Sequence, residues 1–515
     1  MRRLLPLLAL SLLAALLYAG YRGLTASPEA PSGEVQLANG ARLSWTTCWF
    51  EVPEDRPTHC AWFHPASSAG EQAHRLPVVV FRHSGLDHRP SPVLYLAGGP
   101  GGGAWIGPEQ IEGWYYWLEE VDWPHDFVVF DQRGTGMAQP RPDCQELDVL
   151  YADMLDDPLP PAEAAAAGLA AATRCHRRLS AAGHDLAAYS TPANARDARD
   201  LMAALDQAEG QPAGAARWNL YGVSYGTRLA MEIQRRHPER VRSAILDSVY
   251  PPEMDATLTW PGLLQGAMER LFTACESDPG CRERHPRLRE HFPALLARLA
   301  RQPVDLSLPH PYEEEPVQLR VNDERLLYVL FDSLYQWDAI GGLPAALDAL
   351  WRGDSQRLEP LAARHVGSVL DPSFSDAVYL SVECHDARPF DRQAYLDAVH
   401  AHPLSAPYTA AAADADVCAS WPAARAPEDF YEPVRSSLPT LLLAGEMDPV
   451  TPADWAETAA RGYPNGTLLR FPGIGHSVLD SDACAVTLAR RFLANPRRAP
   501  RADCMHNLSP VQFAP

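Results

Sequence analysis

The chain has 515 residues, of which 46% are apolar, and its 65 acidic residues outnumber 44 basic ones to give a formal charge of −21. Single hydrophobic cores stop growing at roughly 250–300 residues, so we expect one large domain with a second domain or a large insertion. A strongly acidic surface repels nucleic acid and anionic lipid. We therefore expect no nucleic-acid partner.

The N-terminus has the pattern of a secretory signal. Met1-Arg2-Arg3 precedes an apolar run from Leu4 to Ala19, and a charged start followed by an apolar core is typical of such signals. The run is shorter than the roughly 20 residues that span a bilayer. We predict that residues 1–26 are a signal peptide, with an uncleaved membrane anchor as the alternative. The protein is then periplasmic or extracellular, or tethered to the membrane.

The cysteines support export to an oxidising compartment. There are ten of them, an even number, as expected of a disulfide-bonded exported protein. None forms a C-x-x-C pair or a Cys/His cluster with zinc spacing, so we expect no metal site. Short separations favour disulfides between neighbours, although spacing alone does not prove connectivity. The expected pairs are Cys48–Cys60, Cys144–Cys175, Cys275–Cys281, Cys384–Cys418 and Cys484–Cys504.

Short apolar runs bounded by Gly, Pro or Asp alternate with helical patterns along the chain. Such runs are typical of buried strands in a parallel sheet. The predicted strands are 77–81, 93–96, 127–130, 218–221, 244–246, 440–443 and 467–471. Alternation of strands and helices predicts a doubly wound, mostly parallel α/β sheet.

One long segment interrupts this alternation. Residues 251–437 are rich in Leu and Ala at helical spacing, which predicts a mostly helical cap inserted before the last two core strands. We expect the core to comprise residues 34–250 and 438–515. The position of the insertion places the cap over the carboxyl ends of the strands, where ligands bind in open α/β sheets.

A serine lies between a predicted strand and a predicted helix. Gly222-Val223-Ser224-Tyr225-Gly226 matches G-x-S-x-G; residues 218–221 precede it and a helical pattern at 227–236 follows. This strand–turn–helix is the nucleophile elbow of α/β-hydrolases, in which the glycines make room for a tight turn. We predict that Ser224 is a nucleophile; an ordinary Gly-rich turn is the alternative.

A serine hydroxyl needs a base to remove its proton, and a carboxylate orients that base. In α/β-hydrolases the chain order is Ser, then Asp or Glu, then His. Asp448 follows the predicted strand 440–443, and His476 follows the predicted strand 467–471. We assign His476 as general base and acid and Asp448 as its orienting carboxylate, with Glu446 as the rival acid.

The oxyanion of a tetrahedral intermediate needs backbone donors. One is expected from Tyr225, the residue after the nucleophile, and the other from a loop after an early strand. The glycine-rich segment 98–103 follows the predicted strand 93–96, and we choose Gly99 as the second donor. No Lys-Ser/Thr follows these glycines, which excludes a Walker phosphate loop. We expect no cofactor.

These motifs in this order resemble prolyl iminopeptidases and their larger secreted relatives, the tripeptidyl aminopeptidases. The resemblance covers roughly residues 45–505 and rests on Gly98–Gly102, Asp131–Gly136, Gly222–Gly226, Gly445–Pro452, Gly475-His476, Cys484 and Cys504. Ala97 replaces the His that prolyl iminopeptidases usually carry, which argues against their specificity more than against catalysis. We expect Asp131 and Arg133 to form a structural ion pair that braces the turn beside the site.

The resemblance implies cleavage of peptides from a free N-terminus, which requires a carboxylate to hold the substrate ammonium. The segment Ser381–Asp386 in the cap is the best candidate, and we rank Asp386 above Glu383; surface acids without function are the alternative. We therefore predict an exported serine exopeptidase acting on peptides. A carboxylesterase or other acyl hydrolase on the same fold is the second hypothesis. The Ser–Asp–His set argues against a non-enzymatic binding protein.

Overall fold

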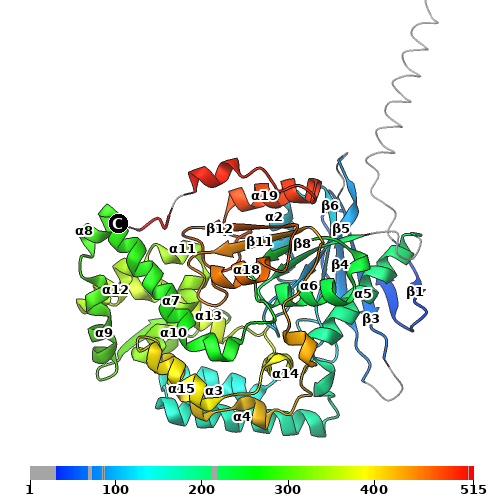
Figure 1. The fold of residues 1–515 in the computed structure, drawn as a ribbon. Coiled ribbons are helices and arrows are strands. Elements are labelled where there is room, and N and C mark those ends of the chain that lie inside the picture. Colours follow the sequence, from blue (N-terminus) through cyan, green and yellow to red (C-terminus); the bar gives the residue numbers. More distant parts are fainter. Residues whose placement is uncertain are drawn as a thin grey trace, which may run out of the picture.

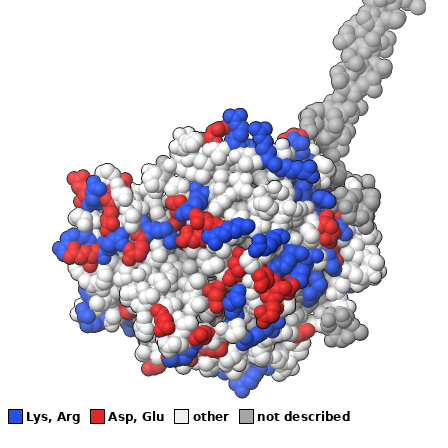
Figure 2. Space-filling view, viewed as in Figure 1, with Lys and Arg blue, Asp and Glu red and all other residues white. Residues whose placement is uncertain are grey.

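The computed structural model describes residues 31–67, 72–83, 85, 87–211, 217–508 and 510–514. The predicted signal peptide or anchor, residues 1–26, lies outside the described residues. Within them, no helix combines the length and apolar character needed to cross a membrane. On the face shown in Figure 2, acidic and basic side chains are interspersed and form no single-sign patch.

A ten-stranded sheet forms the centre of the fold (Figure 1). The strand order is β1-β2-β3-β4-β6-β5-β7-β8-β11-β12; strands pair antiparallel from β1 to β6 and parallel from β6 to β12. The strands are β1 Glu34–Gln36, β2 Arg42–Thr46, β3 Thr58–His64, β4 Leu76–Phe81, β5 Arg89–Leu96, β6 His125–Phe130, β7 Trp218–Val223, β8 Val241–Asp247, β11 Thr440–Gly445 and β12 Gly466–Phe471. All seven predicted strands are present, because most of them are buried on both faces and therefore read as continuous apolar runs. The antiparallel strands β1 to β3 were not predicted.

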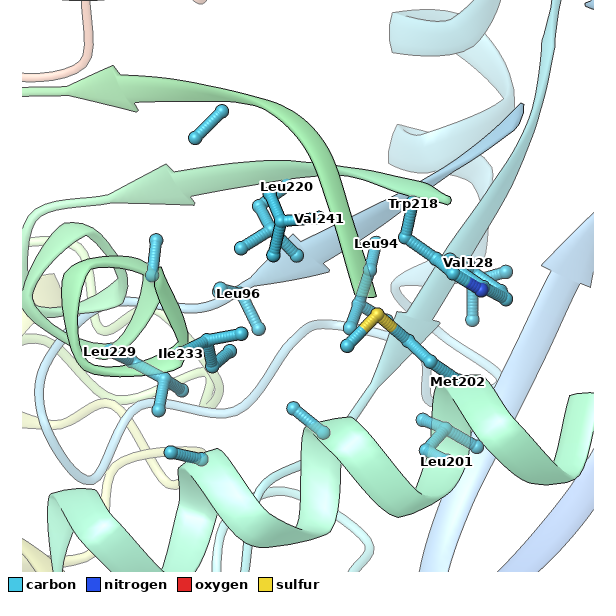
Figure 3. Close-up of a cluster of buried hydrophobic side chains, with 14 of the residues drawn as sticks. Leu94, Leu96, Val128, Leu201, Met202, Trp218, Leu220, Leu229, Ile233 and Val241 are labelled. Atoms are coloured by element: carbon cyan, nitrogen blue, oxygen red, sulfur yellow. The ribbon is translucent and has the colours of Figure 1, made fainter. Parts of the chain in front are cut away.

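Helices cover both faces of the sheet. One face packs against α5 (Thr191–Ala208), α6 (Tyr225–Arg236) and α18 (Ala453–Ala460), and the other against α2 (Ile111–Val121) and α19 (Ala483–Ala494). Figure 3 shows the first of these cores: leucines of β5 and β7 contact Leu201 and Met202 of α5 and Leu229 and Ile233 of α6. This arrangement confirms the predicted α/β-hydrolase fold.

A large insertion separates β8 from β11. It contains α7 Ala256–Ser277, α8 Pro279–Arg284, α9 Leu288–Leu299, α10 Asp323–Tyr335, α11 Trp337–Ile340, α12 Leu343–Trp351, α13 Glu359–Val369, α14 Asp376–Asp386, α15 Arg392–Ala401, α16 Ala406–Thr409 and α17 Val417–Ser420. These helices match the expected helical character. A small antiparallel sheet of β9 (Val304–Leu308) and β10 (Val317–Val321) was not predicted. The insertion has its own hydrophobic core, as expected of a cap.

Two helices from the first half of the chain also lie against this insertion. In Figure 1, α3 (Gln145–Asp156) and α4 (Pro161–Ala181) run beside α14 and α15, away from the sheet. Arg325 of α10 donates a hydrogen bond to the Met154 carbonyl of α3 at 2.8 Å. The sequence placed α3 and α4 with the core, whereas their contacts join them to the insertion. We propose that the cap comprises the predicted segment 251–437 together with this helix pair.

The five disulfides join the expected neighbours. The bonds are Cys48–Cys60, Cys144–Cys175, Cys275–Cys281, Cys384–Cys418 and Cys484–Cys504. No free cysteine occurs among the described residues. Cys144–Cys175 ties α3 to α4, and Cys384–Cys418 ties α14 to α17. Disulfides of this kind persist in oxidising compartments.

Candidate active site

Ser224 occupies a sharp turn at the carboxyl end of β7. Its φ is 58° and its ψ is −124°, a backbone conformation that L-residues other than glycine rarely adopt. The Ser224 amide donates a hydrogen bond to the Asp247 carbonyl of β8 at 3.0 Å, and α6 begins at the next residue. The predicted strand–turn–helix is therefore present, with Ser224 at its apex.

The two glycines of the motif are required by close backbone contacts. A Cβ on Gly222 would lie 2.3 Å from the Gly226 carbonyl oxygen, and a Cβ on Gly226 would lie 1.9 Å from the Leu96 carbonyl oxygen. Both distances are far below a van der Waals contact. The turn can bring α6 this close to β7 and β5 only with glycine at both positions.

Asp448 and His476 meet at the carboxyl ends of β11 and β12. Asp448 Oδ2 lies 2.8 Å from His476 Nδ1, and both side chains are buried. Burial disfavours the charged carboxylate, but the charge and hydrogen bond of His476 and the backbone amides of Thr451 and Val450 outweigh it. The pKa of Asp448 is therefore lowered from its ordinary value. Asp448 can thus orient the imidazole as a carboxylate.

Ser224 and His476 line one cavity of about 1180 Å³. Among the hydrogen bonds of the described residues, none joins the Ser224 hydroxyl to His476. Such a bond commonly tightens only when substrate is bound.

The predicted oxyanion donors belong to two segments that adjoin Ser224, the start of α6 and the glycine-rich loop. Tyr225 is the first residue of α6, where backbone amides have no partner within the helix. Gly98 and Gly99 line the cavity, and a Cβ on Gly98 would lie 3.1 Å from Ser224 Cβ. The glycine-rich loop therefore passes directly over the serine, which supports Gly99 as the second donor.

Two contacts of the histidine were not predicted from the sequence. Thr451 donates its hydroxyl to Asp448 Oδ2 at 2.7 Å, and its Oγ1 lies 3.3 Å from His476 Nδ1. Tyr335, at the end of α10, accepts a hydrogen bond from the His476 amide at 3.0 Å and places its ring 4.4 Å from the imidazole. The acid–base pair is thus held from the core by Thr451 and from the insertion by Tyr335.

Asp247 and Ser248 fix the loop that follows the histidine. The Val478 and Leu479 amides donate to the two Asp247 oxygens at 2.8 and 2.9 Å, and the Ser477 amide donates to Ser248 Oγ at 2.9 Å. Asp247 also accepts the Ser224 amide through its backbone carbonyl. Both residues have no exposed surface. This dipeptide therefore connects the serine turn to the histidine loop.

Asp247→Asn is expected to lower both the free energy of unfolding and kcat. An Asn amide can accept from only one of the two backbone amides and turns a donor toward the other, so one buried group loses its partner at a cost of about 1–3 kcal/mol. A small displacement of His476 lowers kcat by up to about 100-fold. Urea unfolding measures the first effect, and initial rates at saturating substrate measure the second.

Asp206→Asn is the matched control for this variant. Asp206 is also buried, and it accepts the Trp218 indole and Arg240 at 3.0 Å each, far from the histidine loop at the other end of β7. It should lose stability while retaining kcat. If Asp206→Asn and Asp247→Asn lowered kcat equally, the positioning role of Asp247 would be wrong.

The two candidate acids of the cap lie in different environments. Glu383 lines the cavity, and the Tyr250 hydroxyl donates to it at 3.5 Å. Burial raises the pKa of Glu383 to about 7, against the opposing charge of Arg228. Asp386 is also buried but accepts the Thr191 hydroxyl at 2.6 Å, contacts His385 Nδ1 at 2.7 Å and does not line the cavity. The order predicted from sequence, Asp386 before Glu383, is the reverse of what these positions favour.

The expected ion pair between Asp131 and Arg133 is wrong. Asp131 accepts the backbone amides of Ala104 and Met137 at 2.7 and 2.8 Å, and Arg133 pairs with Asp197 at 2.5 Å. Both residues lie in the turn after β6, where strand alternation no longer fixes the side-chain directions, so their closeness in sequence does not bring them together. Asp131 instead anchors the backbone next to the glycine-rich loop.

No group of three or more His, Cys, Asp or Glu side chains able to hold a metal ion occurs in the described ranges. The polar groups that line the cavity around Ser224 include hydroxyls, carboxyls, an imidazole, an amide, indoles and two arginines. A serine hydroxyl, an imidazole paired with a carboxylate, and backbone amides without helical partners are the groups that acyl transfer through a serine requires.

Comparisons with known proteins agree with this chemistry. Residues 405–504 match the family model described as TAP-like protein. The chain is 26% identical over 459 residues to a tripeptidyl aminopeptidase of Streptomyces lividans, which covers 83% of this chain and 80% of that relative. It is 24% identical over 413 residues to the serine protease Hip1 of Mycobacterium tuberculosis, covering 75% of each. An α/β hydrolase structure from Novosphingobium aromaticivorans is 15% identical, with a TM-score of 0.38 over 86% of this chain and 99% of that chain.

The fold and the comparisons define a class: the protein is a serine hydrolase with the α/β-hydrolase fold. Within this class, the resemblance to the tripeptidyl aminopeptidases, expected from the order of the motifs, is confirmed over most of the chain.

Proposed function

We propose that the protein is an exported serine exopeptidase that cleaves peptide bonds near a free N-terminus. Ser224 is the nucleophile, His476 the general base and acid, and Asp448 the carboxylate that orients His476. Gly99 and Tyr225 supply the oxyanion donors. Support comes from the strained serine turn, from the 2.8 Å contact between Asp448 and His476, and from the cavity shared by Ser224 and His476.

The proposed reaction passes through an acyl-enzyme. His476 removes the hydroxyl proton as Ser224 attacks the scissile carbonyl, and the amides of Gly99 and Tyr225 stabilise the oxyanion. His476 then gives the proton to the leaving amine, and the C–N bond breaks. Water attacks the ester in the second half of the reaction, with His476 as base, and the released acid carries the original N-terminus.

The position of the Glu383 carboxylate in the cavity favours a peptidase over other acyl hydrolases. An uncharged ester needs no buried carboxylate in its binding cavity, whereas a substrate ammonium needs one to replace its hydration. Glu383 lies in the same cavity as Ser224 and accepts the Tyr250 hydroxyl. Among the described residues it has no ion-pair partner within hydrogen-bonding distance, and the charge of Arg228 only partly opposes the rise in its pKa. We propose Glu383 as the ammonium-binding residue.

The class of substrate can be tested with peptide anilides of one, two and three residues, each with a free or an acetylated N-terminus, beside aryl esters of short and long acids. A free-amine exopeptidase should cleave the free peptides and lose most of its kcat/KM on acetylation. Turnover of the esters alone, or equal rates on free and acetylated anilides, would favour the acyl hydrolase.

Glu383→Gln is expected to remove the preference for a free amine. In the wild type, the ratio of kcat/KM for free and acetylated substrates should rise as Glu383 ionises near pH 7 and fall as the substrate amine, with a pKa of about 8, loses its proton. The carboxylate and the ammonium coexist only between these values. The variant should lose the pH dependence and about thirtyfold of the ratio, which corresponds to about 2 kcal/mol.

Asp371→Asn serves as the control, because Asp371 is another acid of the cavity lining whose carboxylate already accepts the Ser373 amide at 2.8 Å. In this variant, the ratio of kcat/KM for free and acetylated substrates should match that of the wild type at every pH. An unchanged ratio in Glu383→Gln would exclude Glu383 as the ammonium site, and the same measurement on Asp386→Asn would then test the original ranking.

Export is proposed on two observations. The N-terminal segment has the pattern of a secretory signal, and five disulfides join all ten cysteines. Fractionation of cells that produce the full-length chain, with N-terminal sequencing of the recovered protein, distinguishes a cleaved signal from a retained membrane anchor.

A further inference from the structure

Two large aromatic side chains in the cavity have no part in the reaction as described above. Trp105 is 55% exposed and Trp337 is 51% exposed, and both belong to the lining of the cavity that contains Ser224. Exposing an indole to water forgoes the stabilisation that burying it would give. Exposed aromatic side chains that are concentrated in a concave site therefore indicate a surface for binding apolar groups.

The backbone holds Trp105 in this exposed position. Its φ is 52°, an uncommon conformation for a bulky residue. The residues on either side are fixed by hydrogen bonds: the Ala104 amide donates to Asp131, the Ala104 carbonyl accepts the Trp114 indole at 2.8 Å, and the Ile106 carbonyl accepts the Trp49 indole at 2.7 Å. Strain that surrounding contacts enforce in this way is concentrated at functional sites.

Trp337 lies on the side of the cavity where His476 acts. It follows Tyr335 by two residues, and Tyr335 contacts His476 through both its ring and its carbonyl. His476 gives its proton to the leaving amine. The wall next to His476 is therefore the wall that faces the part of the substrate after the scissile bond.

The backbone next to Trp105 is bonded to α2, and α2 is bonded in turn to the loop that follows His476. Its neighbour Ala104 is bonded to Trp114, and Trp117, one turn further along α2, donates its indole N–H to Asp480 at 2.8 Å. Asp480 follows His476 by four residues and lines the cavity. By contrast, the exposed Tyr379 lies one turn before Glu383 on α14, on the side proposed for the substrate amine.

We propose that Trp105 and Trp337 form a subsite for the side chain of the residue that follows the scissile bond, and that this subsite selects apolar and aromatic residues there. The inference rests on the proposed peptidase function and adds a substrate class to it. Indole rings offer a large contact area with few rotatable bonds, so they bind an apolar side chain at little cost in conformational entropy.

The test compares two free-amine peptides that differ only after the scissile bond, one with Phe and one with Gly at that position. Cleavage is followed by mass spectrometry, and active enzyme is counted by titration with a fluorophosphonate. We expect the wild type to prefer Phe by about tenfold or more in kcat/KM, and Trp337→Ala and Trp105→Ala each to reduce this preference about fivefold. Trp105→Phe should retain most of it.

Tyr116→Ala is the matched control, because Tyr116 is 72% exposed on α2 but lies outside the cavity lining. It should leave the ratio of Phe to Gly unchanged. An unchanged ratio in both tryptophan variants would overturn the subsite. If the wild type cleaved esters and no peptides, the proposed function would fail, and the same variants would be compared on phenethyl and methyl esters. Equal selectivity of wild type and variants there would also overturn the subsite.

Discussion

Ser224→Ala is expected to lower kcat by about 10⁴–10⁶-fold and to abolish labelling by a fluorophosphonate probe. The hydroxyl is the only group that the proposal places in covalent contact with the substrate, and alanine retains the rest of the turn. A residual rate above that of water is expected, because the oxyanion donors and the binding cavity remain. Labelling followed by gel fluorescence and initial-rate measurements give the two readouts.

Ser373→Ala tests whether the probe reports the nucleophile itself. Ser373 also lines the cavity, but it lies in the segment before α14 and has no contact with His476 among the described residues. This variant should be labelled as fast as the wild type. Equal labelling of Ser224→Ala and wild type would show that Ser224 is not the nucleophile.

Asp448→Asn is expected to lower kcat by about 10⁴-fold with a much smaller effect on KM. The Asn amide can donate to His476 Nδ1 and so stabilise the tautomer that cannot accept the serine proton. The loss should be greatest near neutral pH, where the wild-type carboxylate is ionised, since its pKa lies below the ordinary value. A pH profile of kcat and kcat/KM separates this effect from general damage.

Glu446→Gln distinguishes the two acids that the sequence left open after β11. Glu446 is half-exposed and pairs with Arg470 at 3.1 Å, whereas Asp448 has no exposed surface and contacts His476. Exposed pairs of this kind contribute about 0–1 kcal/mol to stability. Glu446→Gln should therefore retain wild-type kcat. A large loss in this variant and none in Asp448→Asn would reverse the assignment.

The sequence predicted the strands that contain a continuous run of apolar residues, whereas β3 is buried but carries Thr and His among its apolar residues. β7, β8 and β11 are almost entirely buried and read as apolar runs between Gly, Pro or Asp. β2 alternates exposed, buried and half-buried residues over five positions, and β9 does the same inside a helical region. Five residues of mixed burial resemble a loop, because nothing in the sequence identifies the partner strand.

For the site, the sequence predicted residues whose type and place along the chain carry information. Asp448 and His476 follow predicted strands and meet at 2.8 Å. It did not predict the roles of Tyr335 and Asp247, because Tyr335 holds His476 by a backbone carbonyl and Asp247 holds backbone amides more than 200 residues away. The Tyr335 carbonyl places no requirement on residue type, and nothing in the sequence links the Asp247 carboxylate to the amides that it accepts so far along the chain.

The contact between α10 and His476 restricts how substrate can enter. The Tyr335 carbonyl accepts the His476 amide, and a Cβ on Gly475 would lie 2.1 Å from the Leu334 carbonyl oxygen. Lifting α10 away from the sheet would break this contact and release the imidazole from its position. An opening that preserves the contact between Asp448 and His476 must therefore leave α10 in place.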